Sequence, residues 1–312
     1  MKILPYKTGD EHAILNLFER SFGKKLSIEY WNWRFANHPS GIRMIMLMWD
    51  GDTLVGHYAV SPAKLVIHQQ EILTALSMTT MTDPAYSGRG IFTQLANALY
   101  EEQNSTNGLS AVWGYPNNNS HYGFIKNLNW VNLEQVPTFT IDASHIETIH
   151  SAVSVSHEFA HAERFVYKQS PVRMKLDTAY LKWRYELNPQ NKYVVFEREY
   201  DGLISYAVAK LFDSFSSPGQ TEVDILEWQV PADEHIQSEF LSAIKVHFAQ
   251  ANVLRFNMWL PLHDKRHIQL EKLGFRNHAP ITYFGIRLLD SRLEALLDAR
   301  NWQHSLGYSD IY

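Results

Sequence analysis

Two glycines flank an arginine at Gly88-Arg89-Gly90, where a run with strand character ends and a run with helical spacing begins. A loop that leaves a strand and opens a helix directs several backbone N–H groups one way, at the positive end of the helix dipole. Glycine removes the Cβ atoms that would hold a ligand away, and arginine adds a positive charge. The sequence therefore predicts a cradle for a phosphate or diphosphate around Gly88, Arg89 and Gly90, at the start of the helix.

The same glycines also have a purely structural interpretation. Gly88 could serve only to make a turn, and Gly90 only to ease helix packing, because isolated glycine patterns are weak signals. No Gly-Lys-Ser/Thr closes the stretch, so it is not a Walker loop. It also lacks the third glycine and the downstream acid of a dinucleotide fingerprint. The surrounding elements must decide between the two interpretations.

Those elements are part of an internal repeat. Residues 27–60 and 177–210 each contain a helix with a Trp-Arg-aromatic core, at 33–35 and 183–185. Each then continues with a proline turn and a strand, followed by an acidic-glycine turn and a second strand that ends in Tyr-Ala-Val. The two segments predict two copies of one folding unit.

The spacing of apolar residues predicts the order of elements in each copy. In the first copy we expect a long helix near 90–103, a strand near 109–115 and a short helix near 118–127. In the second copy we expect a long helix near 233–250 and a strand near 253–260. Mixed strands and helices of this kind make a layered α/β (α+β) fold.

The first copy resembles the GCN5-related N-acetyltransferase (GNAT) family. The strand ending in Thr82-Asp83-Pro84, the stretch Tyr86-Ser87-Gly88-Arg89-Gly90-Ile91 and the amphipathic helix after it resemble the family's motif A. The asparagine-bearing loop and helix of residues 114–130 resemble motif B. The resemblance covers residues 2–141, and the repeat extends it more weakly over 162–289.

The resemblance implies two tandem GNAT-like domains, each a mixed, mostly antiparallel central sheet flanked by helices. We expect an acetyl-CoA-binding domain at 1–145, a degenerate domain at 160–290, and a tail at 291–312 that forms a helix and docks back. The cradle equivalent of the second copy, residues 230–240, has no glycine and carries Asp233 and Glu234. Two carboxylates would repel a diphosphate, so only the first copy is expected to bind the cosubstrate there.

Within the first copy, the resemblance assigns roles along the cosubstrate acetyl-CoA. The cradle, at 88–93, would hold the diphosphate, and the strand residues Thr80, Met81 and Thr82 would hold the pantetheine arm. Backbone N–H groups near Met81 and Thr82 would stabilise the oxyanion, because a splayed strand leaves such groups unpaired. Asn117 and Asn119 would bond the pantetheine amides, with helix capping as the equally good alternative.

The departures from the family pattern concern both the acid and the loop. The usual place of the catalytic tyrosine falls at Ile125, so Tyr122 is the candidate acid, with packing against the strands as its alternative role. Phe92, where the family has a small residue, is expected to narrow the approach to the cradle. Asn129 replaces a turn glycine, and asparagine tolerates the left-handed conformation needed there. His57, Asp83 and Tyr86 are weak candidates for a base.

A competing motif is His157-Glu158-Phe159-Ala160-His161, which matches the H-E-x-x-H zinc pattern. It would place two histidines one helical turn apart, beside a carboxylate able to activate water. The match lies in the connector between the copies, where any helix would be short, and no third ligand is evident. A zinc-dependent hydrolase is therefore the less favoured alternative, and the prediction is no resident metal.

Composition excludes several function classes. The net charge of −5 gives no basic field for nucleic acid, and the absence of cysteine excludes disulfides and thiolate chemistry. No apolar run is long enough to span a membrane, so we expect a soluble, cytoplasmic protein. The expected reaction is acetyl transfer to the amine of a small molecule. The ending "NWQHSLGYSDIY" resembles tails of acetyltransferase-like proteins of surface-polysaccharide gene sets, which favours an amino sugar or nucleotide-linked amino sugar.

Two alternatives with the same fold remain open at this point. The protein could be a non-catalytic acyl-CoA-binding module, as isoleucine at position 125 suggests. Aminoacyl transfer would require an aminoacyl-tRNA partner, which the acidic balance does not favour. The oligomeric state is not predicted.

Overall fold

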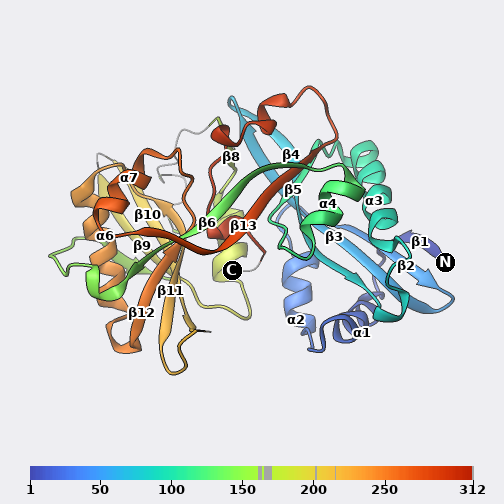
Figure 1. Cartoon of the computed structure of the whole chain (residues 1–312), viewed down its shortest axis with the longest axis horizontal. Coiled ribbons are helices and arrows are strands. Elements are labelled where there is room, and N and C mark those ends of the chain that lie inside the picture. The colour runs from blue at the N-terminus through green and yellow to red at the C-terminus, as the bar shows by residue number, and fades with distance from the viewer. Residues whose placement is uncertain (161–163, 165–170, 201, 215, 311–312) are drawn as a thin grey trace. The chain divides into compact units, whose positions relative to one another are not determined.

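A computed structural model describes residues 1–160, 164, 171–200, 202–214 and 216–310 of the chain (Figure 1). It contains two compact units, each built from separate segments of the sequence. Unit 1 comprises Met1–Glu134, Val172–Lys175 and Tyr283–Ala299, and unit 2 comprises Gln135–Pro171, Leu176–Thr282 and Arg300–Tyr312. The two units therefore do not divide at residues 145 and 290, where we expected the domain boundaries. Each unit takes up segments from both sides of these positions.

The sheet of unit 1 has the strand order β1-β2-β3-β4-β5-β13, and only the β4–β5 pair is parallel. Its strands are β1 (Lys2–Pro5), β2 (Met44–Asp50), β3 (Thr53–Ile67), β4 (Gln70–Thr82), β5 (Ala111–Gly114) and the end of β13 (Arg276–Leu288). The short strand β8 (Val172–Met174) pairs with the end of β3.

Helices cover both faces of this sheet. The helical elements of unit 1 are α1 (Glu11–Phe22), α2 (Ile28–Trp31), the π-helical turn η1 (Asn32–Ala36), α3 (Ile91–Asn107) and α4 (His121–Leu128). Alternate residues of β2 belong to two different core clusters, one shared with α3 and α4 and the other with α1 and α2. Because successive strand residues face opposite sides, the two helix pairs lie on opposite faces (Figure 1).

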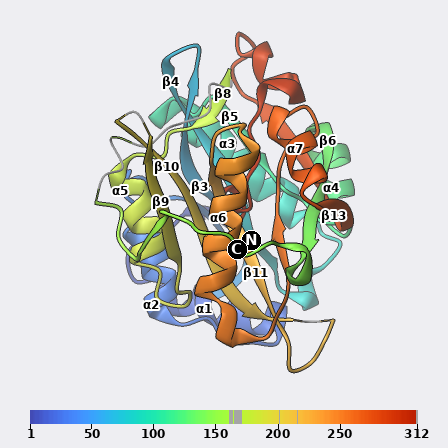
Figure 2. The same ribbon diagram turned by 90° about the vertical axis from the view of Figure 1, so that its left-hand side faces the viewer.

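The sheet of unit 2 repeats the same order, β7-β9-β10-β11-β12-β6, with β11–β12 as its parallel pair. Its strands are β7 (Ser154–Ser156), β9 (Val194–Tyr200), β10 (Leu203–Asp213), β11 (Thr221–Gln229), β12 (Val253–Met258) and the end of β6 (Val131–Asp142). The helical elements are α5 (Thr178–Leu181), the π-turn η5 (Lys182–Glu186), α6 (Glu234–His247) and α7 (Lys265–Lys272). Figure 2 shows α6 lying along this sheet, and Phe240, Leu241 and Ile244 of α6 belong to its core.

The two units also share an unusual local structure. Each has one turn of α-helix, capped by Ser27 or Asp177, that runs into a π-turn containing the Trp-Arg-aromatic sequence. The π-turns close with i→i+5 bonds, Asn37 N to Asn32 O at 2.8 Å and Leu187 N to Lys182 O at 3.0 Å. This shared turn and the common strand order support the repeat inferred from the sequence.

The C-terminal segment differs from the expectation. We predicted a helix in the tail, but the described part of residues 291–312 forms only the short 3-10 turns η7 (Glu294–Leu297), η8 (Ala299–Asn301) and η9 (Leu306–Tyr308). Leu296 is fully buried while its neighbour Leu297 is exposed. This segment therefore has no continuous apolar face that could stabilise a helix by packing against the protein. Trp302 and Tyr308 are buried in unit 2, and Ser305 Oγ donates to the carbonyl of Leu226.

Short 3-10 turns connect several of these elements. They are η2 (Pro84–Tyr86), η3 (Ala143–His145) and η6 (Ala249–Ala251). In the part of the chain that the structure describes, no helix is both long and apolar enough to cross a bilayer.

A buried carboxyl, Glu227 of β11, predicts a pH-dependent stability. Burial raises the pKa of Glu227 to about 7, although Tyr185 Oη donates a 2.7 Å hydrogen bond to Oε1 and Arg184 is near. Between about pH 4.5 and 7 the folded protein thus binds more protons than the unfolded chain, so stability falls as pH rises. We expect a loss of about 2 kcal/mol from pH 5 to pH 7, measured by urea unfolding.

The control for this prediction is Glu227→Gln, which keeps the shape and the acceptor oxygen but cannot ionise. Its unfolding free energy should vary less between pH 5 and pH 7, by about 2 kcal/mol, than that of the wild type. An equal pH dependence in both proteins would show that Glu227 does not titrate in this range.

Candidate functional site

The turn before α3 is held by a carboxylate and a guanidinium. Asp83 Oδ1 accepts a 3.0 Å hydrogen bond from Ala85 N, and Arg20 Nε donates to Asp83 Oδ2 at 2.7 Å. Gly88 and Gly90 follow with φ of 76° and 71°, in the left-handed region that side chains with a Cβ rarely adopt. A Cβ at Gly88 would have no atom within 4 Å, and one at Gly90 would meet only Gln94 Nε2 at 3.7 Å. Both glycines are therefore required by the backbone, and both border open space.

The N–H groups of this loop are available to a ligand. The first helical bond of α3 runs from Gln94 N to Gly90 O at 3.1 Å, and no side chain caps the helix. Within the described residues, no acceptor bonds the backbone N–H of any residue from Gly90 to Thr93. Such a row of free donors at a helix N-terminus suits the oxygens of a diphosphate.

The side chains around the loop leave it accessible. The Arg89 guanidinium lies 4.6 Å from the centre of the Tyr86 ring, and Tyr86 Oη donates to Asp50 Oδ2 at 2.8 Å. The Phe92 ring packs edge-on against Tyr58 and Phe124, with centroids 5.8 and 5.1 Å away. Phe92 thus turns toward the core, and the narrowing we expected from it is not observed.

Strands β4 and β5 diverge beside the loop. They pair only at Ala75–Val112 and Leu76–Trp113. Beyond this point Ser77, Met78, Met81 and Thr82 pair with β3 and not with β5. Asp83 N donates to Val55 O of β3 at 2.9 Å. Since successive N–H groups of a strand point to opposite edges, the N–H of Thr82 faces the open edge and that of Met81 faces β3. Of the two expected oxyanion donors, the geometry favours Thr82.

The three base candidates each have a structural partner. His57 is fully buried, its Nδ1 lies 2.8 Å from the carbonyl of Thr79, and burial lowers its pKa to about 4. The hydrogen bond from Arg20 lowers the pKa of Asp83, and Tyr86 bonds Asp50. Thr79 has φ of 46° at a bulge in β4, so His57 holds an irregular point of the strand.

The loop before α4 combines capping with exposed side chains. Asn117 Oδ1 accepts from Asn119 N at 3.0 Å and from Ser120 N at 3.1 Å, so this oxygen caps the turn. Among described residues, no partner bonds the side chain of Asn119. Tyr122 is 69% exposed, so its ring is not packed against the strands as the alternative role required. The left-handed conformation expected of Asn129 is confirmed by its φ of 53°.

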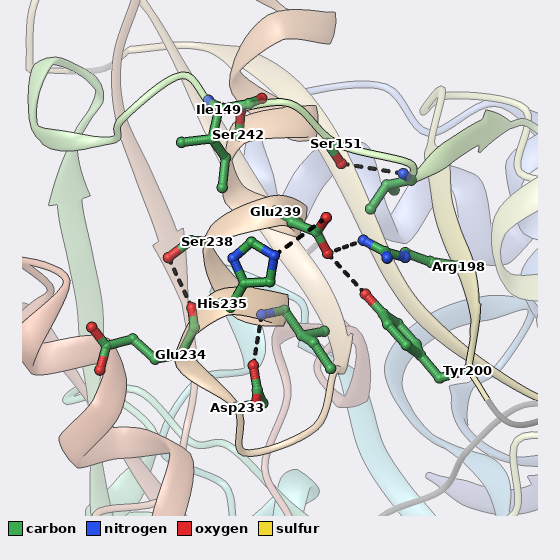
Figure 3. Close-up of polar contacts among 12 residues, drawn as sticks. Ile149, Ser151, Arg198, Tyr200, Asp233, Glu234, His235, Ser238, Glu239 and Ser242 are labelled. Atoms are coloured by element: carbon green, nitrogen blue, oxygen red, sulfur yellow. Dashed lines mark hydrogen bonds and ion pairs between the residues drawn. The ribbon is translucent and has the colours of Figure 1, made fainter.

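The corresponding helix of unit 2 is closed by its own side chains. Asp233 Oδ1 accepts from Ile236 N at 2.9 Å and caps α6, in contrast to the uncapped α3. Figure 3 shows Glu239 of α6 joined to two residues of β9: Arg198 Nη1 donates to its Oε2, and Tyr200 Oη donates to the same oxygen at 3.0 Å. A capped helix start with carboxylates offers no cradle for a diphosphate.

This cluster predicts a stability effect. Glu239 is 5% exposed, so Glu239→Ala leaves the Arg198 guanidinium and the Tyr200 hydroxyl without their acceptor. We expect a loss of about 2 kcal/mol of unfolding free energy, measured by urea denaturation. The matched control is Glu234→Ala, an exposed acid of the same helix, with an expected loss of about 0.5 kcal/mol. Equal effects of the two substitutions would contradict a structural role for the cluster.

The zinc motif does not form a helix where the structure describes it. His157 and Glu158 lie in a bend after β7, and His157 Nδ1 is 2.8 Å from the carbonyl of Tyr193. His161 lies outside the described residues. Within the described part of the chain, no group of three or more His, Cys, Asp or Glu side chains is arranged to hold a metal ion.

Comparisons with known proteins agree with this geometry. The model of the acetyltransferase (GNAT) domain matches residues 2–131. No curated protein sequence matches the chain. Among solved structures, a probable N-acyltransferase from Enterococcus faecalis V583 is similar with a TM-score of 0.71 at 12% identity, over 94% of this chain and 74% of that one.

Two further structures show the same fold. A GCN5-related N-acetyltransferase from Kribbella flavida has a TM-score of 0.67 at 15% identity, over 93% of this chain and 71% of its own. The Saccharomyces cerevisiae N-myristoyltransferase with bound myristoyl-CoA has a TM-score of 0.61 at 9% identity, over 91% of this chain and 82% of its own. At these identities the likeness establishes the fold.

Proposed function

We propose that the chain, whose residues 2–131 match the model of the acetyltransferase (GNAT) domain, is a GNAT-type acyl-CoA N-acyltransferase that transfers acetyl from acetyl-CoA to the amine of a small molecule. The observation that carries the proposal is the row of unbonded N–H groups from Gly90 to Thr93 on an uncapped helix. These donors and Arg89 would hold the diphosphate.

The rest of the site follows from the divergence of β4 from β5. The open edge of residues 77–82 offers backbone groups to the amides of the pantetheine arm, with Asn117 and Asn119 on the facing loop. Direct attack by a neutral amine on the thioester carbonyl produces a tetrahedral oxyanion, which needs a hydrogen-bond donor. The N–H of Thr82 faces the open edge, where it is available to the arm. Tyr122, exposed at the start of α4, is the proposed acid for the leaving thiolate.

The proposed acceptor class is an amino sugar or a nucleotide-linked amino sugar. The resemblance of the chain's ending to tails of acetyltransferase-like proteins of surface-polysaccharide gene sets supports this class. Amino sugars are therefore the first amines to screen, by following release of the free thiol of CoA.

Calorimetric titration of acetyl-CoA into the full chain tests the cosubstrate site. We expect micromolar binding, equivalent to about −8 kcal/mol. Absence of binding would sink the proposal. Binding without thiol release for any amine would instead identify an acyl-CoA-binding module.

A further inference from the structure

The closed end of the β4–β5 divergence is lined by a serine and a glycine. Ser77 follows the last β4 residue that pairs with β5, and Gly114 follows the last β5 residue that pairs with β4. A Cβ built on Gly114 would lie 3.5 Å from both Ser77 Cβ and Ser77 O. Ser77 is partly exposed, so its hydroxyl is accessible at the point where the strands separate.

A series of hydrogen-bonded side chains leads from Ser77 into the core of unit 1. Ser77 Oγ is 3.0 Å from Tyr58 Oη, which is 2.7 Å from Tyr100 Oη, and Trp130 Nε1 donates to Tyr100 Oη at 3.2 Å. The three aromatic residues are at most 3% exposed. In the described structure these groups have no other hydrogen-bond partners.

The indole fixes the direction of this chain. An indole N–H can only donate, so the Tyr100 oxygen accepts from Trp130. A buried hydroxyl also needs an acceptor for its own proton, and the Tyr58 oxygen is the one within reach of Tyr100. By the same reasoning we infer that Tyr58 donates to Ser77 Oγ, which lies 3.0 Å from its hydroxyl oxygen. The hydroxyl proton of Ser77 is therefore not used within this series of hydrogen bonds, and Ser77 is free to donate it into the gap between β4 and β5.

We propose that Ser77, in place of the N–H of Thr82, donates a hydrogen bond to the acetyl oxygen of acetyl-CoA as that oxygen becomes an oxyanion, and that Tyr58 and Tyr100 act as positioning residues. The inference rests on the proposed function. The cradle lies beyond Thr82, and four residues of β4 separate Thr82 from Ser77. Because of the bulge this stretch spans four positions of β3, roughly 13 Å of strand. An arm anchored by its diphosphate at the cradle would reach the closed end with its acyl group.

The chemistry balances without a proton from Ser77. The amine nitrogen forms the new C–N bond, the C–S bond breaks, and the proton lost by nitrogen ends on the sulfur. Ser77 keeps its proton and only stabilises the negative charge on oxygen. One donor of this kind typically changes kcat by about 100-fold or more.

The first test is spectroscopic and needs no acceptor. Acetyl-CoA labelled with ¹³C at the carbonyl is bound to the full chain, and its carbonyl stretch is measured by difference infrared spectroscopy. We expect a lower frequency in the wild type than in Ser77→Ala, because the hydrogen bond weakens the C=O bond. Ser105→Ala, which removes an exposed hydroxyl on α3, is the matched control and should give the wild-type frequency.

The second test uses an amine that supports thiol release. Ser77→Ala should lower kcat about 100-fold with little change in KM for acetyl-CoA. Tyr58→Phe should lower kcat less, and Ser77→Ala/Tyr58→Phe should be no slower than Ser77→Ala alone, because Tyr58 acts through Ser77. Purely structural roles would instead give additive losses and leave the carbonyl frequency unchanged.

The outcomes separate this inference from the proposed function. If the wild type binds acetyl-CoA and Ser77→Ala has the same carbonyl frequency and kcat, the role of Ser77 is wrong and the acyltransferase proposal stands. If the wild type does not bind acetyl-CoA, both fail.

Discussion

Replacing Gly90 with glutamate is expected to weaken acetyl-CoA binding at least about 100-fold, a loss of about 2.7 kcal/mol. Gly90 has φ of 71°, so any Cβ there costs about 1 kcal/mol of backbone strain. A Cβ would meet no atom closer than Gln94 Nε2 at 3.7 Å, so a side chain fits, and its carboxylate would lie among the N–H groups that the diphosphate needs. Repulsion between the two anions supplies the larger part of the loss. Isothermal titration calorimetry measures it.

Two controls separate charge from strain. Gly90→Ala carries the strain without the charge and should weaken binding about 10-fold or less. Gly108→Glu places the same side chain at the other end of α3, where Gly108 has φ of 70° and equally open surroundings. It should bind acetyl-CoA as the wild type does. If Gly90→Glu bound acetyl-CoA with wild-type affinity, the diphosphate would have to bind elsewhere than in this loop.

The elements that the sequence predicted well are local in the chain. The cradle at residues 88–93 stays a prediction, although its glycines and the helical spacing after them can be read within a few residues of one another. The long helices expected near 90–103 and 233–250 are confirmed as α3 and α6, and the strand near 109–115 as β5. Strong periodicity and short range made these predictions reliable.

The features that could not be predicted depend on contacts between distant residues. Nothing in the sequence indicates that the end of β13 pairs with β5 or that the end of β6 pairs with β12. The three hydrogen bonds that lead from Ser77 to Trp130 join residues that are 19, 42 and 30 positions apart in the sequence. Its hydroxyls and indole belong to residues that pattern analysis assigns to the core. Tertiary packing alone brings them together.

Close packing of α3 against the sheet gives the second large effect, at Gly56 of β3. A Cβ on Gly56 would overlap Ile91 Cγ2 and would lie 3.0 Å from Leu95 Cδ1 and 3.1 Å from Met48 Cβ. Gly56→Ala should therefore push the first turn of α3 away from the sheet, at a cost of about 3 kcal/mol in unfolding free energy. Urea denaturation measures the loss.

The displacement links stability to binding, because Ile91 belongs to the cradle. Gly56→Ala is expected to weaken acetyl-CoA binding about 10-fold, without any change in the charge of the site. Ile91→Ala removes the overlapping methyl group, so the double variant should be more stable than the sum of the single losses predicts. Additive losses would show that the strand and the helix start do not press on each other here. In that case the position of the cradle would depend on the other contacts of the loop, the Arg20–Asp83 pair and the Tyr86–Asp50 hydrogen bond among them.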